Sequence, residues 1–409
     1  MVRTKLRGVG LTTAMLVLAT LAISNATAGE TTTYEVVVGK YLVPDASWAT
    51  STRFFPSTIK VHQNDLLHFT SELPETATLL PAGQLPGTWV KANWKGIGKP
   101  WSSFVADPND GATARRINMR SIAPSHFCGW PGQDPCSFDA SGDAVDGVMS
   151  SGLSLATSGG GDTFVNRELD FTVRVTAPAG TTFYVLSLSH PKMRMKVEVV
   201  AEEVVASDQA AIDATSATQT TTDLNLAKSL NKEYSARREY TLVRGAKVWK
   251  AWAGVDTPKV SLLRMYPLKL VINKGEKVKF NFSQLVSQAH TVTFPLSKAL
   301  EIAAGSPRPS CEEDGVDSPP TLDTYPFCDD PAQLEFEIPA AIGKKAGDGV
   351  YLGGTDFESS GVRGGGFATN KKAHVIKFAA RSNVNGFVWG CMVHDIGGDL
   401  LESAKVVVE

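Results

Sequence analysis

The chain has 409 residues, a formal net charge of −2, and 43% hydrophobic and 20% charged residues. This length is enough for two or three domains with sizeable cores. The balanced charge leaves no basic stripe, so the composition argues against a nucleic-acid partner. Short Val/Thr/Phe-rich runs separated by many glycines and prolines predict strands and turns rather than long helices.

Residues 1–28 have the form of a secretory signal peptide. Basic residues stand at Arg3, Lys5 and Arg7, residues 11–23 are apolar, and Ala26-Thr27-Ala28 resembles a cleavage site. No later stretch is long and apolar enough to span a bilayer. We therefore expect a secreted, periplasmic or cell-envelope protein whose mature chain begins near Gly29 and has no membrane span.

Residues 29–200 read as a first β-domain. Strand-sized runs include TYEVVVGKYLV, FFPSTIKVHQNDLLHFTSE and ETATLLP at its start, and ELDFTVRVTA and TTFYVLSLS near its end. Runs of this length, with turn residues between them, are typical of a β-sandwich. A long polar insertion and a Gly/Ser-rich loop separate the two groups of strands.

Residues 201–235 change in character and residues 236–409 then repeat the first pattern. The intermediate segment is rich in Ala, Thr, Ser and Asp, which predicts a linker with one or two helical turns. After it, MYPLKLVINKGEKVKFNFSQ matches FFPSTIKVHQNDLLHFTSE, and QAHTVTFP falls where LPETATLLP fell. An internal duplication with a period of about two hundred residues predicts two similar domains in tandem.

The five cysteines divide into two local pairs and one remaining thiol. Cys128 and Cys136 bracket one polar loop, and Cys311 and Cys328 bracket another. In an exported protein, local disulfides within each loop are the simplest arrangement. Cys391 is then left over, and such a thiol is usually buried or engaged as a ligand because an exposed one would oxidise.

Two stretches of the second half place metal-ligand side chains in a regular pattern. Residues 387–399, FVWGCMVHDIGGD, contain Cys391 and His394 in a short loop before a Val-rich final strand. Residues 288–295, QAHTVTFP, place His290 in a strand-like alternation. One thiolate and two imidazoles form the trigonal ligand set of a blue-copper electron-transfer centre.

These stretches resemble the cupredoxin (plastocyanin-like, type 1 blue copper) family. The resemblance rests on the proline-led strand pair, the H-x-V-x-F histidine and the C-x-x-H loop before the last strand, and it extends over both halves. It implies an all-β fold of two tandem Greek-key β-sandwich domains with long loop insertions. It further implies one copper ion, cycling between Cu(I) and Cu(II), bound by His290, Cys391 and His394. Thr291 would be the polar neighbour that steadies the cysteine loop.

The sequence departs from the family in two respects. The axial methionine expected shortly after the last histidine is missing. The site is then three-coordinate, or it takes Asp399, Met392 or a backbone oxygen such as that of Gly397 as a weak axial ligand. In the first half, the same alignment places Thr76 at the histidine position and Ser187 at the cysteine position. We therefore expect the first domain to be metal-free, the alternative being a weak Cu(I) site made by His190, Met193 and Met195.

The histidines also bear on enzyme activity. Multicopper oxidases and copper nitrite reductases draw further copper ligands from histidines in neighbouring domains, whereas this chain has seven histidines and none in an H-x-H pair. We therefore predict a non-enzymatic protein that exchanges one electron with an exported redox partner. The alternative is an exported copper-scavenging or structural β-sandwich module with no redox role.

Overall fold

The computed structural model describes residues 31–43, 48–73, 75–94, 99–101, 104–106, 115–117, 125–126, 128–142, 148–152, 169–282, 289–298, 301, 345–364, 372–392 and 403–409. Residues 32–409 form one compact unit. The predicted signal peptide, 1–28, lies outside the described residues. The proposed division into domains at residues 200 and 236 stays a prediction.

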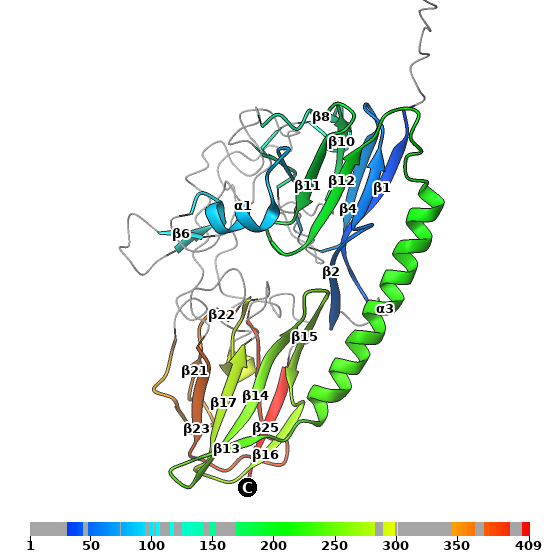
Figure 1. Ribbon diagram of the computed structural model, residues 1–409. Helices are drawn as coiled ribbons and strands as arrows, with labels where there is room; N and C mark the ends of the chain where they lie inside the picture. Colours follow the sequence, from blue (N-terminus) through cyan, green and yellow to red (C-terminus); the bar gives the residue numbers. More distant parts are fainter. Residues whose placement is uncertain are drawn as a thin grey trace, which may run out of the picture. The chain divides into compact units, whose positions relative to one another are not determined.

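The strands fall into two sets, which we call the first and second repeats (Figure 1). The first repeat comprises β1 (Thr33–Tyr41), β2 (Ala49–Phe55), β3 (Thr58–Val61), β4 (Leu66–Ser71), β5 (Thr78–Leu80), α1 (Pro86–Asn93), β6 (Phe104–Ala106), β7 (Arg115–Ile117), β8 (Cys136–Phe138), β9 (Met149–Ser150), β10 (Leu169–Val175), β11 (Thr182–Leu186) and β12 (Arg194–Val199).

The second repeat follows a long helix, α3 (Gln209–Ala236). It comprises β13 (Tyr240–Val243), β14 (Ala246–Asp256), β15 (Val260–Tyr266), β16 (Lys269–Ile272), β17 (Lys277–Phe282), β18 (Ala289–His290), β19 (Thr293–Phe294), β20 (Val350–Tyr351), β21 (Glu358–Ser359), β22 (Arg363–Gly364), β23 (His374–Phe378), β24 (Phe387–Gly390) and β25 (Ser403–Val408).

The fold is an all-β sandwich, as predicted. In the first repeat, β1, β4 and β10 lie in one sheet and β3, β12, β11, β5 and β9 in another. Strands such as β10 bury alternate residues, which matches the period of two expected for a half-buried strand. One apolar cluster holds the buried side chains of both sheets, including Val36, Phe69, Phe171, Phe183 and Val197. The core therefore lies between the two sheets.

The principal strand pairings of the first repeat recur in the second. β1 pairs with β2 antiparallel and with β4 parallel, and β14 pairs in the same way with β15 and β17. β3 pairs parallel with β12, as β16 does with β25. Both β1 and β14 carry an irregularity at a positive-φ glycine, Gly39 and Gly254. The sequence repeat is thus matched in the sheet topology.

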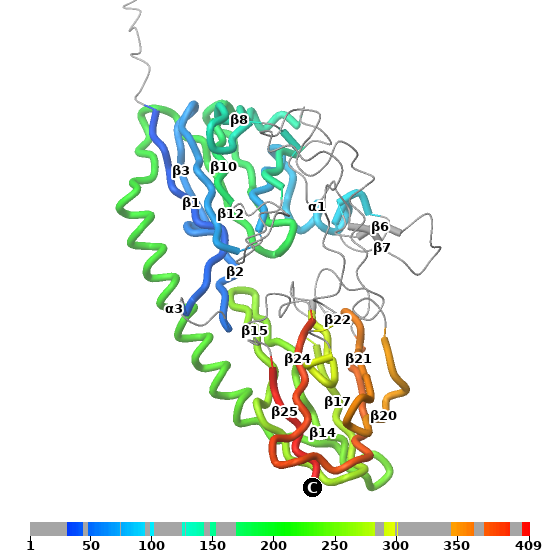
Figure 2. Tube along the Cα trace, turned by 180° about the vertical axis from the view of Figure 1, so that it is seen from behind, coloured from blue at the N-terminus to red at the C-terminus, as the bar shows by residue number. Residues whose placement is uncertain are grey.

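The sheets of the two repeats are joined into one by their equivalent strands. β2 pairs antiparallel with β15, with Thr50 opposite Ser261, and this pairing completes an 11-stranded sheet. The two 5-stranded sheets, one in each repeat, remain separate. Figure 2 shows β2 and β15 meeting beside α3.

The segment predicted as a linker with one or two helical turns, residues 201–235, is mostly the 28-residue helix α3. Asp208 caps its N-terminus by accepting a hydrogen bond from the backbone N–H of Ala211. Ala227 is buried, and Leu224, Leu230 and Tyr234 are partly buried against an apolar cluster with Leu262 and Tyr266. The helix is stabilised by packing against β2 and β15, which its small residues allow it to approach closely. Its apolar residues show little helical periodicity, so the sequence resembles a linker.

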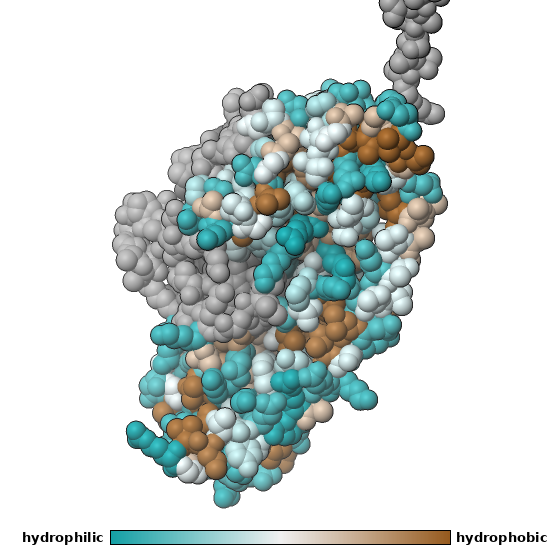
Figure 3. Space-filling view, viewed as in Figure 1, coloured by the Kyte–Doolittle hydropathy of each residue, from teal (hydrophilic) through white to brown (hydrophobic). Residues whose placement is uncertain are grey.

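On the face seen in Figure 3, apolar side chains gather only in small groups between hydrophilic ones. No helix among the residues that the structure describes is long and apolar enough to span a membrane. Cys128 and Cys136 form a disulfide, whereas the predicted partners Cys311 and Cys328 lie outside the described residues.

Candidate metal centre

Two of the three predicted copper ligands lie in described parts of the second repeat, and both are buried. His290 ends β18, and Cys391 follows directly after β24; each is 0% exposed. Cys391 forms no disulfide. His394, Gly397 and Asp399 lie outside the described residues, and the described residues alone contain no group of three potential metal ligands. The ligand set as a whole therefore stays a prediction.

Thr291 connects the two described ligands. Its backbone N–H donates a hydrogen bond to Cys391 Sγ over 3.3 Å, and its hydroxyl Oγ1 accepts one from the N–H of Met392 over 2.7 Å. Because Thr291 directly follows His290, these bonds hold the thiol beside the histidine strand. The hydroxyl also accepts a hydrogen bond from Thr293. The role of Thr291 beside a copper ion stays a prediction.

Gly254 makes room for the imidazole of His290. A side chain at this position would place its Cβ 2.1 Å from His290 Nε2, well inside van der Waals contact, and the backbone φ of Gly254 is +69°. Both facts demand glycine here. The Nε2 edge of the ring thus rests against the backbone of β14. Sequence reasoning missed this residue, although its alignment with Gly39 in the two repeats (VVVGKY and AWAGVD) would have indicated it.

An aromatic cluster surrounds the cysteine. Trp389, two residues before Cys391 and 1% exposed, stacks on Phe294 with ring centroids 6.0 Å apart and meets Phe280 edge-on at 4.8 Å. The same apolar cluster contains Phe378 and Cys391 itself. Such a setting keeps water away from a thiolate and fixes the strand that carries it.

A buried positive charge lies next to the histidine strand. Arg363 is paired with His290 between β18 and β22 and is 7% exposed. Its guanidinium donates hydrogen bonds to the carbonyl oxygens of Ser360 (2.9 Å) and Lys372 (2.7 Å). Burial lowers the pKa of Arg363 from its ordinary value. Sequence reasoning missed this charge because nothing in the spacing marks Arg363 as inward-facing.

His374 is a buried, neutral histidine of β23. Burial, and then the charges of Arg363 and Lys345, lower its pKa to about 3. Its side chain is 3% exposed in β23, opposite Phe280 of β17. A histidine that resists protonation this strongly would be unable to act as a proton carrier near neutral pH.

The predicted correspondence between the two repeats is wrong by one residue at the histidine position. Thr78 pairs with Ser150 between β5 and β9, as Thr293 pairs with Ser359 between β19 and β21. Thr76 therefore corresponds to Thr291, and Glu75, not Thr76, takes the place of His290. The pairing of the strands reveals this, whereas the aligned letters LPETATLLP and QAHTVTFP do not fix it.

The cysteine position is occupied by Ser187, as predicted. The backbone N–H of Thr76 donates to Ser187 Oγ over 3.3 Å, just as Thr291 donates to Cys391 Sγ. Met193 and Met195, the alternative Cu(I) ligands, lie in the apolar core of the first repeat. His190 instead faces Glu75, with Nδ1 2.5 Å from Oε1.

No protein-family model and no curated protein matches this chain. Among solved structures it is similar to the multicopper oxidase mgLAC, at 10% identity over 65% of this chain and 66% of that one, with a TM-score of 0.16. It is also similar to a multicopper oxidase from Pseudomonas thermotolerans, at 11% identity over 93% of this chain and 100% of that one, with a TM-score of 0.16.

The comparison corrects one prediction from the sequence. A non-enzymatic protein is expected from the scarcity of histidines, but both solved structures are oxidases by title, and oxidases are enzymes. The prediction that the chain is not an enzyme is therefore not kept.

Proposed function

We propose that the second repeat holds one copper ion, bound by His290, Cys391 and His394, and that the protein exchanges single electrons with an exported redox partner. The observation that carries this proposal is the hydrogen bond from Thr291 N to Cys391 Sγ. It holds a buried thiol, distant in sequence, against the residue that follows the buried His290. Copper bound by such ligands cycles between Cu(I) and Cu(II).

The donor set suits copper. A thiolate and imidazoles are soft enough for Cu(I) and acceptable to Cu(II). With the Nε2 edge of His290 against Gly254, the ring would offer Nδ1 to the ion. The chain's own part is then to hold these donors stiffly, through Thr291 and the aromatic cluster around Trp389, and to exclude water.

A copper-scavenging role is the second candidate, and the loop sequence favours it in one respect. The positions where a family member would have its axial methionine hold Gly397 and Asp399. A carboxylate in the axial place would favour Cu(II) over Cu(I) and so oppose rapid redox cycling. The two candidates differ in the rate of electron exchange and agree on copper.

Copper reconstitution of residues 29–409 tests the proposal. The wild-type chain should take up one copper ion, show an intense visible absorption from the thiolate–copper bond, and lose and regain it on reduction and oxidation. Cys391→Ser and His290→Gln should abolish the absorption. His374→Gln, which changes another buried histidine of the same repeat, should keep it.

Two outcomes would contradict parts of the proposal. A copper-loaded wild-type chain without the visible absorption would show that Cys391 is not a ligand. Reversible colour with slow exchange in stopped-flow mixing with small cytochromes would favour the scavenger over the electron carrier.

A further inference from the structure

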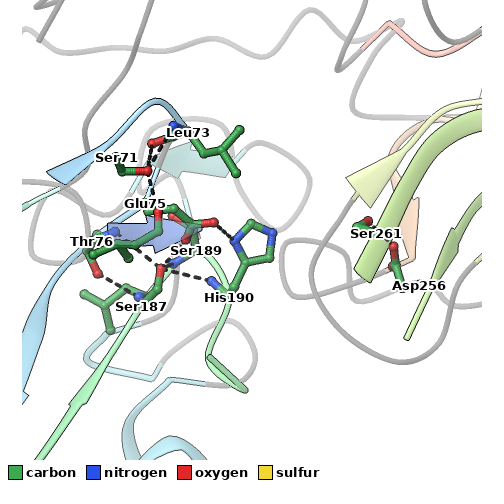
Figure 4. A network of polar contacts seen from close by, with 11 residues as sticks. Ser71, Leu73, Glu75, Thr76, Ser187, Ser189, His190, Asp256 and Ser261 are labelled. Carbon is green, nitrogen blue, oxygen red and sulfur yellow. Dashed lines mark hydrogen bonds and ion pairs between the residues drawn. The ribbon is translucent and has the colours of Figure 1, made fainter. Parts of the chain in front are cut away.

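The first repeat buries three polar side chains at the places that the candidate copper ligands take in the second repeat. They are Glu75, Ser187 and His190, which are 0%, 0% and 5% exposed. Figure 4 shows the three side chains turned toward one another, with Ser71, Thr76 and Ser189 around them. Burying three polar side chains is costly unless they form hydrogen bonds or ion pairs with one another or with the backbone.

Glu75 bridges the other two. Ser187 Oγ donates a hydrogen bond to Glu75 Oε2 over 2.6 Å, and His190 Nδ1 lies 2.5 Å from Glu75 Oε1 (Figure 4). Both atoms of the second contact carry lone pairs, so a contact this short is favourable only when the pair holds a proton. The carboxylate therefore contacts both other side chains, through a hydrogen bond at Oε2 and an ion pair at Oε1.

Ser187 is held as Cys391 is held. Its oxygen accepts hydrogen bonds from the backbone N–H groups of Thr76 (3.3 Å), Ser189 (3.2 Å) and His190 (3.3 Å). The hydroxyl of Thr76 accepts one from the N–H of Leu188 over 2.8 Å, as Thr291 does from Met392. The loop that follows β11 thus has the support that the cysteine loop has after β24.

The neighbouring strands are also arranged alike. The N–H of Ala77 donates to Ser151 Oγ over 2.9 Å, and that of Val292 donates to Ser360 Oγ over 2.8 Å. Gly39, the counterpart of Gly254, lies against Glu75: a Cβ there would be 3.2 Å from Glu75 Oε1. The two frameworks therefore match in backbone, in supporting hydroxyls and in the glycine that faces the first ligand position.

We propose that the first repeat contains a second site built on the framework of the candidate copper centre, in which Glu75, Ser187 and His190 hold a proton in place of a metal ion. The comparison of Glu75 and Ser187 with the copper ligands His290 and Cys391 rests on the proposed function. The proton held by Glu75, Ser187 and His190 does not. The copper set of one thiolate and imidazoles is changed at two of its described places, to a carboxylate at Glu75 and a hydroxyl at Ser187.

The residues that replace the copper ligands in the first repeat suit a bound proton better than a metal ion. A neutral serine hydroxyl is a far weaker ligand for copper than a thiolate. The hydroxyl of Ser187 also donates its hydrogen bond to Glu75. The negative charge of the carboxylate is balanced by the proton shared with His190, so no metal cation is required. Removing either member alone would leave the other buried without its partner, which is costly.

The first test restores the ligands. In a Cys391→Ser background, where the candidate copper centre is disabled, the chain should bind neither Cu(II) nor Zn(II) in a titration followed by equilibrium dialysis. Adding Glu75→His and Ser187→Cys should give one bound copper ion and an intense visible absorption. Each of these two changes alone is the matched control and should give no such absorption.

Two results would overturn the proposal. Copper or zinc uptake by the Cys391→Ser chain that is lost with Glu75→Gln would mean that the natural cluster is a metal site. A triple variant that shows native near-ultraviolet circular dichroism but binds no copper would mean that the framework of a metal centre has not been retained.

A second test needs no metal and remains informative if the triple variant does not fold. Urea unfolding in EDTA is measured for Glu75→Gln, His190→Gln and the double variant. Each single change should shift the unfolding equilibrium by about a hundredfold or more, and the double variant should lose much less than the sum. Additive losses would overturn the shared proton. If the wild-type chain takes up no copper while the coupling is present, the proposed function fails and the proton site stands.

Discussion

At the scale of single residues, the clearest steric constraint is at Gly254. Gly254→Ala would put a Cβ 2.1 Å from His290 Nε2 on a backbone with a φ of +69°. We expect the strained backbone to lower the free energy of unfolding by about 1–3 kcal/mol and the displaced imidazole to weaken copper binding further. Urea unfolding and the visible absorption after copper reconstitution would measure the two effects separately.

Gly39→Ala is the matched control for this prediction. Gly39 has a φ of +66°, but its nearest neighbour would be 3.1 Å from the new Cβ, at the flexible end of Leu73. It should therefore lose stability through backbone strain and leave the second repeat's copper absorption intact. Equal copper uptake by Gly254→Ala and Gly39→Ala would argue against the placement of His290.

The burial of His374 makes stability depend on pH. Its pKa is lowered to about 3 in the folded chain, whereas an unfolded histidine titrates near 6.5. Above about pH 6.5 both states are neutral and stability is complete. As the pH falls from about 6.5 toward 3, only the unfolded chain gains a proton, so the free energy of unfolding should fall by about 1.4 kcal/mol per pH unit from this group.

His374→Gln should remove that slope. The difference between wild type and variant, from urea unfolding at several pH values between about 4 and 8, isolates the contribution of His374. His62→Gln, which changes a partly solvent-exposed histidine, serves as the control and should leave the slope in place. A slope unchanged by His374→Gln would mean that this histidine is hydrated in the folded chain.

At the scale of elements, α3 is anchored by a buried carboxylate. Asp223 is 0% exposed, accepts a hydrogen bond from Ser51 Oγ over 2.7 Å, and forms an ion pair with Arg53 at 2.8 Å. Asp223→Ala would leave the Arg53 guanidinium without its partner, and we expect a loss of about 3 kcal/mol in the free energy of unfolding.

An exposed carboxylate of the same helix provides the comparison. Asp213 accepts a hydrogen bond from Gln209 at the surface, so Asp213→Ala should change stability by less than about 0.5 kcal/mol. Urea unfolding of both variants would decide the matter. Similar small losses in the two would show that Asp223 does not hold α3 onto the sheet.

The sequence predicts the elements of this fold unevenly, for physical reasons. Alternation of buried and exposed residues identifies strands such as β10 and β25, and the repeat predicts that their pairings recur. The helix α3 is not found, because it is buried through small residues such as Ala227 and a carboxylate such as Asp223, which give little apolar periodicity.

The ligand set of the candidate site stays a prediction, whereas part of its surroundings could not be read from the sequence. His290 and Cys391 are both buried, and Cys391 Sγ accepts a hydrogen bond from the residue that follows His290. Glu75 was missed because a shift of one residue in a strand is invisible in short aligned stretches but reverses which side chain faces inward. Arg363 was missed because its environment is made by β18, which lies far from it in sequence.

At the scale of the whole molecule, the two repeats meet through equivalent strands. The pairs Val260–Ser51, Ser261–Thr50 and Leu262–Ala49 place matching positions of β15 and β2 opposite one another in antiparallel order. The N–H of Leu263 also donates to the carbonyl of Trp48 over 2.8 Å, and that of Thr52 to Lys259 over 2.9 Å. Because β2 and β15 pair with each other, neither strand exposes its unpaired backbone groups as a sheet edge.

This shared sheet should make the repeats unfold together. Residues 32–409 form one compact unit, so differential scanning calorimetry of the wild-type chain should show a single transition. Leu263→Pro removes the N–H that bonds Trp48 and places a ring within the strand pair, at a cost of about 3 kcal/mol. The coupling between the repeats should weaken, and the transition should divide in two.

Thr241→Pro, in the edge strand β13, is the control, because β13 pairs only with β14 of the same repeat among the described strands. It should lower the transition temperature without dividing the transition. If Leu263→Pro also unfolds in one step at a lower temperature, the strand pair is not what couples the repeats. The contacts of α3 with β2 and β15 would then be responsible, and combining Leu263→Pro with Asp223→Ala should divide the transition.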